Sequence, residues 1–241
     1  MSTLKTGIRT AESTASVQDY LGAIYDLAGS GQPVIGARLA KHMRVSPPAV
    51  TEALQRMARA GYIRVGAGKE IAFTRKGRAL ARVMARRHRL LERWLTDVLG
   101  LNWTEAHEEA HRLEHAVSPR VESRLATSLG MPRTCPHGNP IPGMPMPPRT
   151  HPFPLDQAKE GITVVVERIT EEAEADRRLL EHLWKHQVKP GTRLAIREVA
   201  PWAGTITMSA LGGRGGMIVL GLAAAAKIWV HQPGAAGAPR G

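Results

Sequence analysis

The sequence predicts a mainly helical protein with a small β domain at its carboxyl end, and three observations support this. Apolar residues recur at helical spacing through most of the first 130 residues. A stretch rich in proline interrupts this pattern at residues 131–154, which we interpret as a linker. Beyond it, one helical segment (176–187) and short apolar runs between Gly and Pro turns are typical of a small β-barrel, with strands expected at residues 161–169, 193–199, 205–210 and 217–222. We therefore expect domains at residues 1–77, 78–150 and 151–241.

The first domain has the element order of a winged helix-turn-helix. Two amphipathic helices come first, and Ser46 followed by Pro47 is a strong start signal for a third helix. Two short strand-like runs joined by a Gly-rich turn complete the pattern of helix, helix, tight turn, helix and hairpin. The elements are expected at residues 16–29, 34–43, 46–61, 62–65 and 70–74.

The second domain is predicted to be an antiparallel layer of helices. One long periodic helix should run from Arg78 to about Gly100. A second should begin at Asn102 or Thr104 and continue to Val117, and Ser118 before a proline should cap a third. These helices carry more apolar surface than a lone domain needs, which favours dimerisation.

Four potential metal ligands fall within nine residues of the second of these helices, and a continuous helix would place them within an arc of about 100°. They are His107, His111, Glu114 and His115. His88 and Glu92 repeat the four-residue spacing on the preceding helix. Imidazole and carboxylate groups suit divalent transition metals, so we favour a metal site over ordinary surface histidines. Neither Ser nor Cys flanks these histidines, which argues against nucleophilic catalysis, and we expect no enzyme.

The third helix of the first domain is expected to read DNA in the major groove, rather than serve only for packing. Its outward positions offer hydroxyl, amide, carboxylate and apolar contacts to bases. Arg64 and Lys69 on the hairpin would reach the phosphate backbone, and the net charge of +12 agrees with that role. The candidate helix contacts are Ser46, Pro48, Thr51, Glu52 and Gln55.

The remaining composition bears on the compartment. The chain has one cysteine, Cys135, so it forms no internal disulfide and suits a reducing compartment. The longest apolar run, residues 217–226, is well short of the ~20 residues that a membrane span needs. We expect a cytoplasmic protein that does not enter a membrane. Cys135-Pro136-His137 is interpreted as a turn in the linker and left outside the metal site.

The order of parts resembles the metal-dependent repressor family of the diphtheria toxin repressor, the iron-dependent regulators and the manganese transport regulators. The resemblance extends over nearly the whole chain and implies that the carboxyl-terminal domain is SH3-like. The segments that carry it are YLGAIYDL (20–27), SPPAVTEALQRMARAGYI (46–63), RHRLLERWLTDVLGL (87–101), AHEEAHRLEHAVS (106–118) and HGNPIPG (137–143).

The resemblance implies two metal sites. The primary site would use Asp19, His111, Glu114 and His115. The ancillary site would use His88, Glu92 and His107, with Glu174 or Asp176 as candidates to complete it.

The chain departs from both subtypes of the family. Iron-type members have methionine and cysteine at the positions of Asp19 and His111, and manganese regulators usually have glutamate at the positions of Gly22 and His111. Because manganese prefers oxygen and imidazole ligands, we favour Mn²⁺, with Fe²⁺ as the alternative. Glu52 replaces the family's glutamine-like reader, so the resemblance does not imply the operator sequence.

The hypothesis that follows is a homodimeric repressor of metal-uptake genes, activated by a divalent metal and bound to a palindromic double-stranded operator. Asp19 lies in the first domain and the other primary ligands in the second. Metal binding is therefore expected to fix the two recognition helices at the half-site spacing of ~34 Å. The alternative is a metal-storage module or metalloenzyme without sequence-specific DNA binding.

Overall fold

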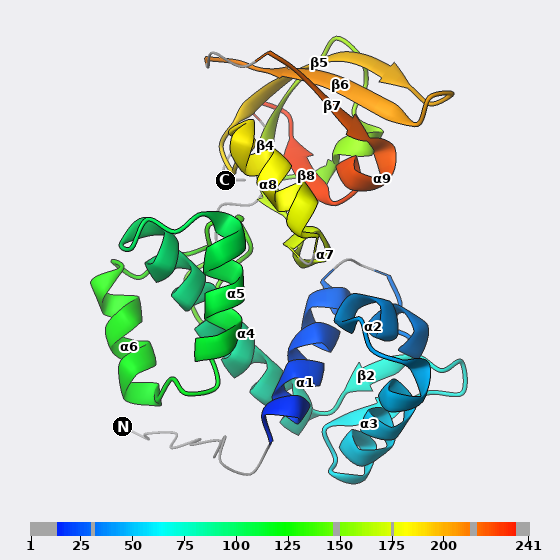
Figure 1. Cartoon of the computed structure of the whole chain (residues 1–241), viewed down its shortest axis with the longest axis vertical. Helices are drawn as coiled ribbons and strands as arrows, with labels where there is room; N and C mark the ends of the chain where they lie inside the picture. Colours follow the sequence, from blue (N-terminus) through cyan, green and yellow to red (C-terminus); the bar gives the residue numbers. More distant parts are fainter. Residues whose placement is uncertain (1–13, 30–31, 147–149, 175, 213–215, 235–241) are drawn as a thin grey trace, which may run out of the picture. The chain divides into compact units, whose positions relative to one another are not determined.

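The computed structural model describes residues 14–29, 32–146, 150–174, 176–212 and 216–234. The chain forms two compact units (Figure 1). The first unit comprises residues 1–87 together with 114–116, and the second comprises residues 88–113 and 117–241.

The first unit has the predicted winged helix-turn-helix order. Thr14 and Ser46 cap their helices by accepting hydrogen bonds from backbone N–H groups three residues on, and Pro47 follows Ser46 as the first helical residue. The elements are α1 (Ala15–Ala28), α2 (Gly36–Met43), α3 (Pro47–Arg59), β1 (Ile63–Val65), β2 (Ile71–Phe73) and the first part of α4 (Arg75–Asp97).

The core of the first unit joins α1 to α3 and the hairpin. Leu21 and Ile24 of α1 are fully buried in the same cluster as Val50 and Met57 of α3. Strands β1 and β2 pair antiparallel, and the N–H of Ile71 donates to the carbonyl of Val34 at 2.8 Å. The hairpin is therefore tied to the chain just before α2.

The helical part of the second unit contains the remainder of α4, α5 (Trp103–Leu113) and α6 (Pro119–Ser128). Asn102 starts α5 through a capping box: its Oδ1 accepts from the Glu105 N–H at 3.0 Å, and Glu105 Oε2 accepts from the Asn102 N–H at 3.1 Å. The prediction that α5 continues to Val117 is wrong, because it ends at Leu113.

Glu114 and His115 consequently lie in a turn and not on the helical stripe with His107 and His111. These turn residues belong to the first unit, where His115 contacts Gln18 and Asp19 of α1. Tertiary contacts with α1 thus override the helical pattern of the sequence at this point.

Residues 131–146 form a packed loop, which corrects the prediction of a linker over this part of the chain. Cys135 and His137 are buried. The Cys135 N–H donates to the Asn139 carbonyl at 2.9 Å, and the Ile169 N–H donates to the His137 carbonyl at 2.8 Å. Residues 147–149 of the predicted linker lie outside the described part of the chain.

The carboxyl-terminal part of the second unit is a curved antiparallel sheet with strand order β3-β8-β4-β5-β6-β7 (Figure 1). Irregular register between Val166 and Arg168 and between Ile196 and Glu198 bends the two central strands. The strands are β3 (Phe153–Pro154), β4 (Thr163–Ile169), β5 (Arg193–Ala200), β6 (Thr205–Ala210), β7 (Met217–Gly221) and β8 (Ile228–His231).

Helix α8 (Arg177–Lys185) packs Leu180 and Leu183 into the core of this sheet, as the predicted single helix at 176–187 required. The sequence pattern missed β3, β8 and the short helices α7 (Glu171–Glu174) and α9 (Leu222–Ala225). Among the helices of the described residues, none combines the length and apolar character needed to cross a membrane.

Candidate metal centres and DNA-reading surface

The first candidate centre lies within the first unit and consists of Asp19, Glu114 and His115. Their ligand atoms all lie within 4.8 Å of one another. His115 Nε2 is 2.9 Å from Asp19 Oδ1 and 3.6 Å from Glu114 Oε1. Two carboxylates and one imidazole converge here without sulfur, which is a ligand set for a hard or borderline divalent cation.

Gln18 supports this group and was not anticipated from the sequence. Its side chain is buried, and its Oε1 lies 2.9 Å from His115 Nδ1. Because an amide oxygen only accepts hydrogen bonds, this contact orients the ring through a hydrogen bond from His115 Nδ1. Nε2 then faces Asp19 and Glu114 and is the ring nitrogen that would bind a cation.

Replacing Gln18 by Leu is expected to lower Mn²⁺ affinity of this group by about 10–100-fold, the usual cost of losing a hydrogen bond that orients a histidine ligand. The affinity can be measured by calorimetric titration with Mn²⁺. A Glu92→Gln background, which weakens metal binding in the second unit, would isolate binding by Asp19, Glu114 and His115. Gln32→Leu, at an exposed position, is the matched control. Equal affinities in the two variants would contradict the role of Gln18.

His111, the fourth residue predicted for the primary site, belongs to the second unit. It lies in the last turn of α5, exposed, with its ring centroid 6.5 Å from that of His88. Its membership of the primary site stays a prediction.

The second unit brings together the predicted ancillary residues. His88 and Glu92 lie one turn apart on α4, and His107 lies on α5. Glu92 Oε1 is 3.1 Å from His88 Nε2 and 3.0 Å from His107 Nδ1. Of the two completing residues considered, Glu174 joins this group, with Oε2 3.7 Å from His107 Nδ1. Asp176 instead caps α8 by accepting from the Leu179 N–H.

Cys135 and His137, which the sequence analysis left outside the metal site, lie against the same two glutamates. His137 Nδ1 is 3.1 Å from Glu174 Oε1, 3.6 Å from Glu92 Oε2 and 3.9 Å from Cys135 Sγ. All four side chains are buried, and their ligand atoms lie within 4.8 Å of one another. The sequence signal for this pair was the Cys-x-His spacing of Cys135 and His137. It was set aside because the surrounding proline content suggested a linker.

Burial and charge perturb this cluster strongly. Burial alone would raise the pKa of Glu92, but the facing imidazoles of His88 and His137 bring that pKa well below its usual value. Burial would lower the pKa of His137, whereas the carboxylates of Glu174 and Glu92 raise it well above the usual value. Burial raises the pKa of Cys135, and the Glu92 carboxylate adds to that shift. The metal-free cluster therefore contains a buried ion pair.

The metal-free protein should consequently lose stability when the pH rises through the raised pKa of His137. The contribution of His137 to folding is complete below its usual pKa of 6.5, because the folded state binds the proton more tightly than the unfolded state. The Glu92 contribution has the opposite sign and is lost only as the pH falls through its lowered pKa. Thermal unfolding of chelator-treated protein between neutral and alkaline pH measures this, and His137→Gln should flatten the alkaline decline. Parallel declines in the two proteins would contradict the assignment.

Neighbouring polar groups hold the loop and Glu174 in place. Asn139 Nδ2 donates to Glu174 Oε1 at 2.9 Å and to the Ile169 carbonyl at 2.7 Å. Arg89 of α4 donates to the Pro140 carbonyl and forms an ion pair with Glu171. Hydrogen bonds and an ion pair, and not packing alone, therefore position Glu174 and the loop that carries Cys135 and His137.

The predicted DNA-reading residues of α3 and the hairpin are all exposed. Ser46 and Thr51 also make local bonds, since Ser46 Oγ caps α3 and Thr51 Oγ1 donates to the Pro47 carbonyl at 3.0 Å. Glu52 forms an ion pair with Arg56 one turn later, so its carboxylate is partly neutralised. Arg56 itself was missed by the sequence analysis. The surface remains a candidate for DNA contact.

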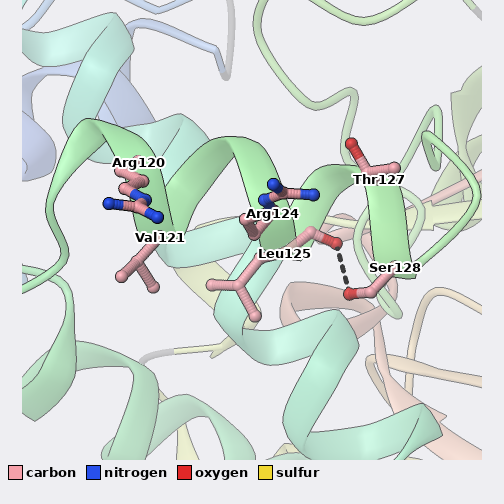
Figure 2. Close-up of a pocket in the computed structure, with 6 residues that line it drawn as sticks. All are labelled: Arg120, Val121, Arg124, Leu125, Thr127 and Ser128. Atoms are coloured by element: carbon pink, nitrogen blue, oxygen red, sulfur yellow. Dashed lines mark hydrogen bonds between the residues drawn. The ribbon is translucent and has the colours of Figure 1, made fainter.

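A hollow of about 460 Å³ follows α6 and contains no histidine, cysteine or carboxylate among its lining residues. Figure 2 shows Val121 and Leu125 projecting from the same side of the helix, with Arg120 and Arg124 beside them. The Ser128 hydroxyl donates to the Leu125 carbonyl at 3.0 Å. The Val121 and Leu125 side chains of this hollow suit contact with another apolar surface, and its lining residues offer no metal site.

Comparison with known proteins gives the same division of roles. Family models match at residues 12–69 (iron dependent repressor, N-terminal DNA binding domain), 74–143 (iron dependent repressor, metal binding and dimerisation domain) and 153–232 (FeoA domain). The iron-dependent repressor IdeR of Mycobacterium tuberculosis is 38% identical over 203 residues, which cover 80% of this chain and 88% of that protein. The chain belongs to the iron-dependent repressor family.

Other members of the family extend the comparison. The diphtheria toxin repressor of Corynebacterium diphtheriae is 42% identical over 125 residues, covering 52% of this chain and 55% of that protein. A manganese-dependent transcriptional repressor in complex with manganese superposes with a TM-score of 0.79 at 35% identity, over 90% of this chain and 99% of that one. The manganese regulator SloR gives a TM-score of 0.74 at 30% identity, over 90% and 98% of the two chains.

This membership makes the chain a metal-dependent, DNA-binding transcriptional regulator with a winged helix-turn-helix, a helical dimerisation domain and an SH3-like FeoA domain. Both iron and manganese regulators occur among its relatives. The exact domain boundaries, at residues 1–77, 78–150 and 151–241, stay predictions.

Proposed function

We propose that this protein is a homodimeric repressor of metal-uptake genes that Mn²⁺ activates, with Fe²⁺ as the weaker alternative. The observation that carries the proposal is the group of Asp19, Glu114 and His115, whose oxygen and imidazole atoms lie within 4.8 Å of one another. Manganese gains little from sulfur ligands, and this group contains none. His111 would add a second imidazole.

The first unit supplies a physical route from this group to the DNA surface. A divalent cation bound there would neutralise the repulsion between the Asp19 and Glu114 carboxylates. Asp19 lies on α1, whose Leu21 and Ile24 share a buried core with Val50 and Met57 of α3. Holding the turn of Glu114 against α1 therefore stabilises the core that positions the recognition helix.

Binding to a palindromic operator is supported by charge and by exposed apolar surface. The net charge of +12 favours contact with phosphates. Four large aliphatic residues of the helical region are exposed and suit a homodimer interface: Val98, Leu99, Leu113 and Val121. A symmetric dimer would present its two α3 helices to half-sites ~34 Å apart.

The test begins by selecting duplexes from a random-sequence pool with purified protein and Mn²⁺, and then measures affinity by gel shift. Metal should strengthen binding about 5–150-fold over chelator-treated protein, the usual range of coupling between two sites. Asp19→Asn should remove the metal dependence, and Gln55→Ala should weaken binding in both conditions. Equal affinity of the wild-type protein with Mn²⁺ and with chelator would overturn the proposal.

Asp19→Met should shift selectivity from Mn²⁺ towards Fe²⁺, because a thioether is a softer ligand than a carboxylate. Anaerobic titration with each metal in a Glu92→Gln background would give the ratio of the two affinities. The Glu92→Gln protein with Asp19 intact is the control. An unchanged ratio in Asp19→Met would show that ligand softness at residue 19 does not determine the choice.

A further inference from the structure

We propose that the second unit binds two divalent cations next to each other, bridged by the carboxylates of Glu92 and Glu174. This extends the proposed function, which requires only one activating metal, and rests on its premise that the protein binds divalent cations. We call His88 and His107 the imidazole side of the centre, and Cys135 and His137 its thiol side.

The two oxygens of Glu92 face opposite sides of the centre. Oε1 lies 3.1 Å from His88 Nε2 and 3.0 Å from His107 Nδ1, on the imidazole side. Oε2 lies 3.6 Å from His137 Nδ1, on the thiol side. A carboxylate with this orientation can give one oxygen to each of two cations.

Glu174 repeats the arrangement from α7. Its Oε2 lies 3.7 Å from His107 Nδ1, whereas its Oε1 lies 3.1 Å from His137 Nδ1. Asn139 fixes this orientation by donating from Nδ2 to Glu174 Oε1 at 2.9 Å. Both shared carboxylates therefore point one oxygen to the imidazole side and the other to the thiol side.

The donors form two groups of four, and each group includes both glutamates. One group adds the two histidines of the imidazole side, and the other adds Cys135 and His137. Four donors suffice for one cation in each group. Binuclear sites in proteins hold their metals at about 3.5–4 Å, a separation that carboxylate bridges accommodate.

Buried polar atoms on the thiol side provide an independent reason for a second cation. Within the described residues, Glu92 is fully buried and its Oε2 makes no hydrogen bond, since His137 Nδ1, which faces it, is 3.6 Å away. Leaving a carboxylate oxygen buried without a hydrogen bond is unfavourable. A cation on the imidazole side alone would leave this oxygen as it is, whereas a cation on the thiol side would bind it.

Charge is consistent with two cations. If the second cation binds Cys135 as a thiolate, the centre contains three negative charges, two from carboxylates and one from sulfur. Two divalent cations with three neutral imidazoles then give a total of one positive charge. The thiol side should prefer a borderline or soft divalent ion, because it contains the chain's single sulfur nucleophile.

The test is an anaerobic Co²⁺ titration of the full chain carrying Asp19→Asn and His115→Gln, which remove the metal group of the first unit. We expect two equivalents of bound Co²⁺, one of which produces a thiolate-to-cobalt charge-transfer band in the near ultraviolet. Cys135→Ser should remove this band and one equivalent. His107→Gln should remove the other equivalent and keep the band.

Loading the same protein with Mn²⁺ provides a second measurement. Two bridged Mn²⁺ ions are magnetically coupled, so the electron paramagnetic resonance signal per bound ion should be weaker than in Cys135→Ser. Circular dichroism would verify that each variant is folded.

Binding of one Co²⁺ or none to the folded double variant would overturn the inference. So would two ions with uncoupled Mn²⁺ signals, because the bridge would then be absent. The proposed function and this inference can be tested independently. If DNA binding by the wild-type protein does not depend on Mn²⁺ but the double variant binds two Co²⁺ ions, only the proposed function is overturned. If DNA binding depends on Mn²⁺ while one Co²⁺ binds, only the inference is overturned.

Discussion

Glu92→Gln is expected to lower metal affinity of the second unit by more than about 100-fold, since removing an anionic ligand should cost more than the 10–100-fold of a lost supporting hydrogen bond. The side chain keeps its shape but loses the charge, and only one of its oxygen positions can still bind metal. Because Glu92 faces both sides of the centre, both sides should be affected.

The loss can be measured by metal analysis after dialysis against micromolar Mn²⁺ or Co²⁺ and by thermal unfolding. A ligand at 100 times its dissociation constant stabilises a folded protein by about 2.7 kcal/mol, and most of that metal-induced shift should disappear from the second unit. Glu160→Gln, at an exposed position of the same unit, is the control and should behave like the wild type. Full metal content in the folded Glu92→Gln protein would exclude Glu92 as a ligand.

Gly138→Ala is expected to be the most destabilising single methyl addition near the centre. Gly138 has a φ of +90°, and a Cβ built there would lie 2.3 Å from the carbonyl oxygen of Glu167 on β4. Neither atom can move without shifting backbone, because the adjacent His137 carbonyl accepts from the Ile169 N–H of the same strand. The loop carrying Cys135 and His137 must therefore separate from β4 or distort.

Gly191→Ala is a matched control, because its φ is +88° but nothing lies within 4 Å of its built Cβ. The left-handed conformation should cost both variants about 1–2 kcal/mol. The backbone overlap should cost Gly138→Ala roughly 1–3 kcal/mol more. Chemical denaturation of metal-free protein would measure the difference, and equal losses would show that the loop tolerates the overlap. Gly138→Ala should also weaken the thiolate-to-cobalt band, whereas Gly191→Ala should leave it unchanged.

Local signals in the sequence were enough for the architecture. The Ser46-Pro47 start of α3 and the capping box at Asn102 depend on hydrogen bonds within one turn of chain, so the residues that make them stand close together in the sequence. Strands β4, β5, β6 and β7 of the sheet were found for a related reason. Their alternation of buried and exposed residues reflects one strand at a time. The two-residue β3 carried too short a pattern to be detected.

The candidate site depended on contacts between distant segments. Helical periodicity extended α5 through Glu114 and His115, whereas their contacts with α1, almost a hundred residues earlier, place them in a turn. Proline content suggested a linker around Cys135, whereas backbone bonds to Asn139 and from Ile169 make it a buried loop.

The sequence by itself therefore determined the longer helices, the caps at Ser46 and Asn102, the central strands and the kinds of metal ligand available. Only the tertiary structure decided that Gln18 supports His115 and that Glu92 and Glu174 are shared between two groups of donors. The physical reason is range. Caps and periodicity arise from interactions over a few residues, but a carboxylate's partners depend on which distant segments fold against it, and no local pattern encodes that.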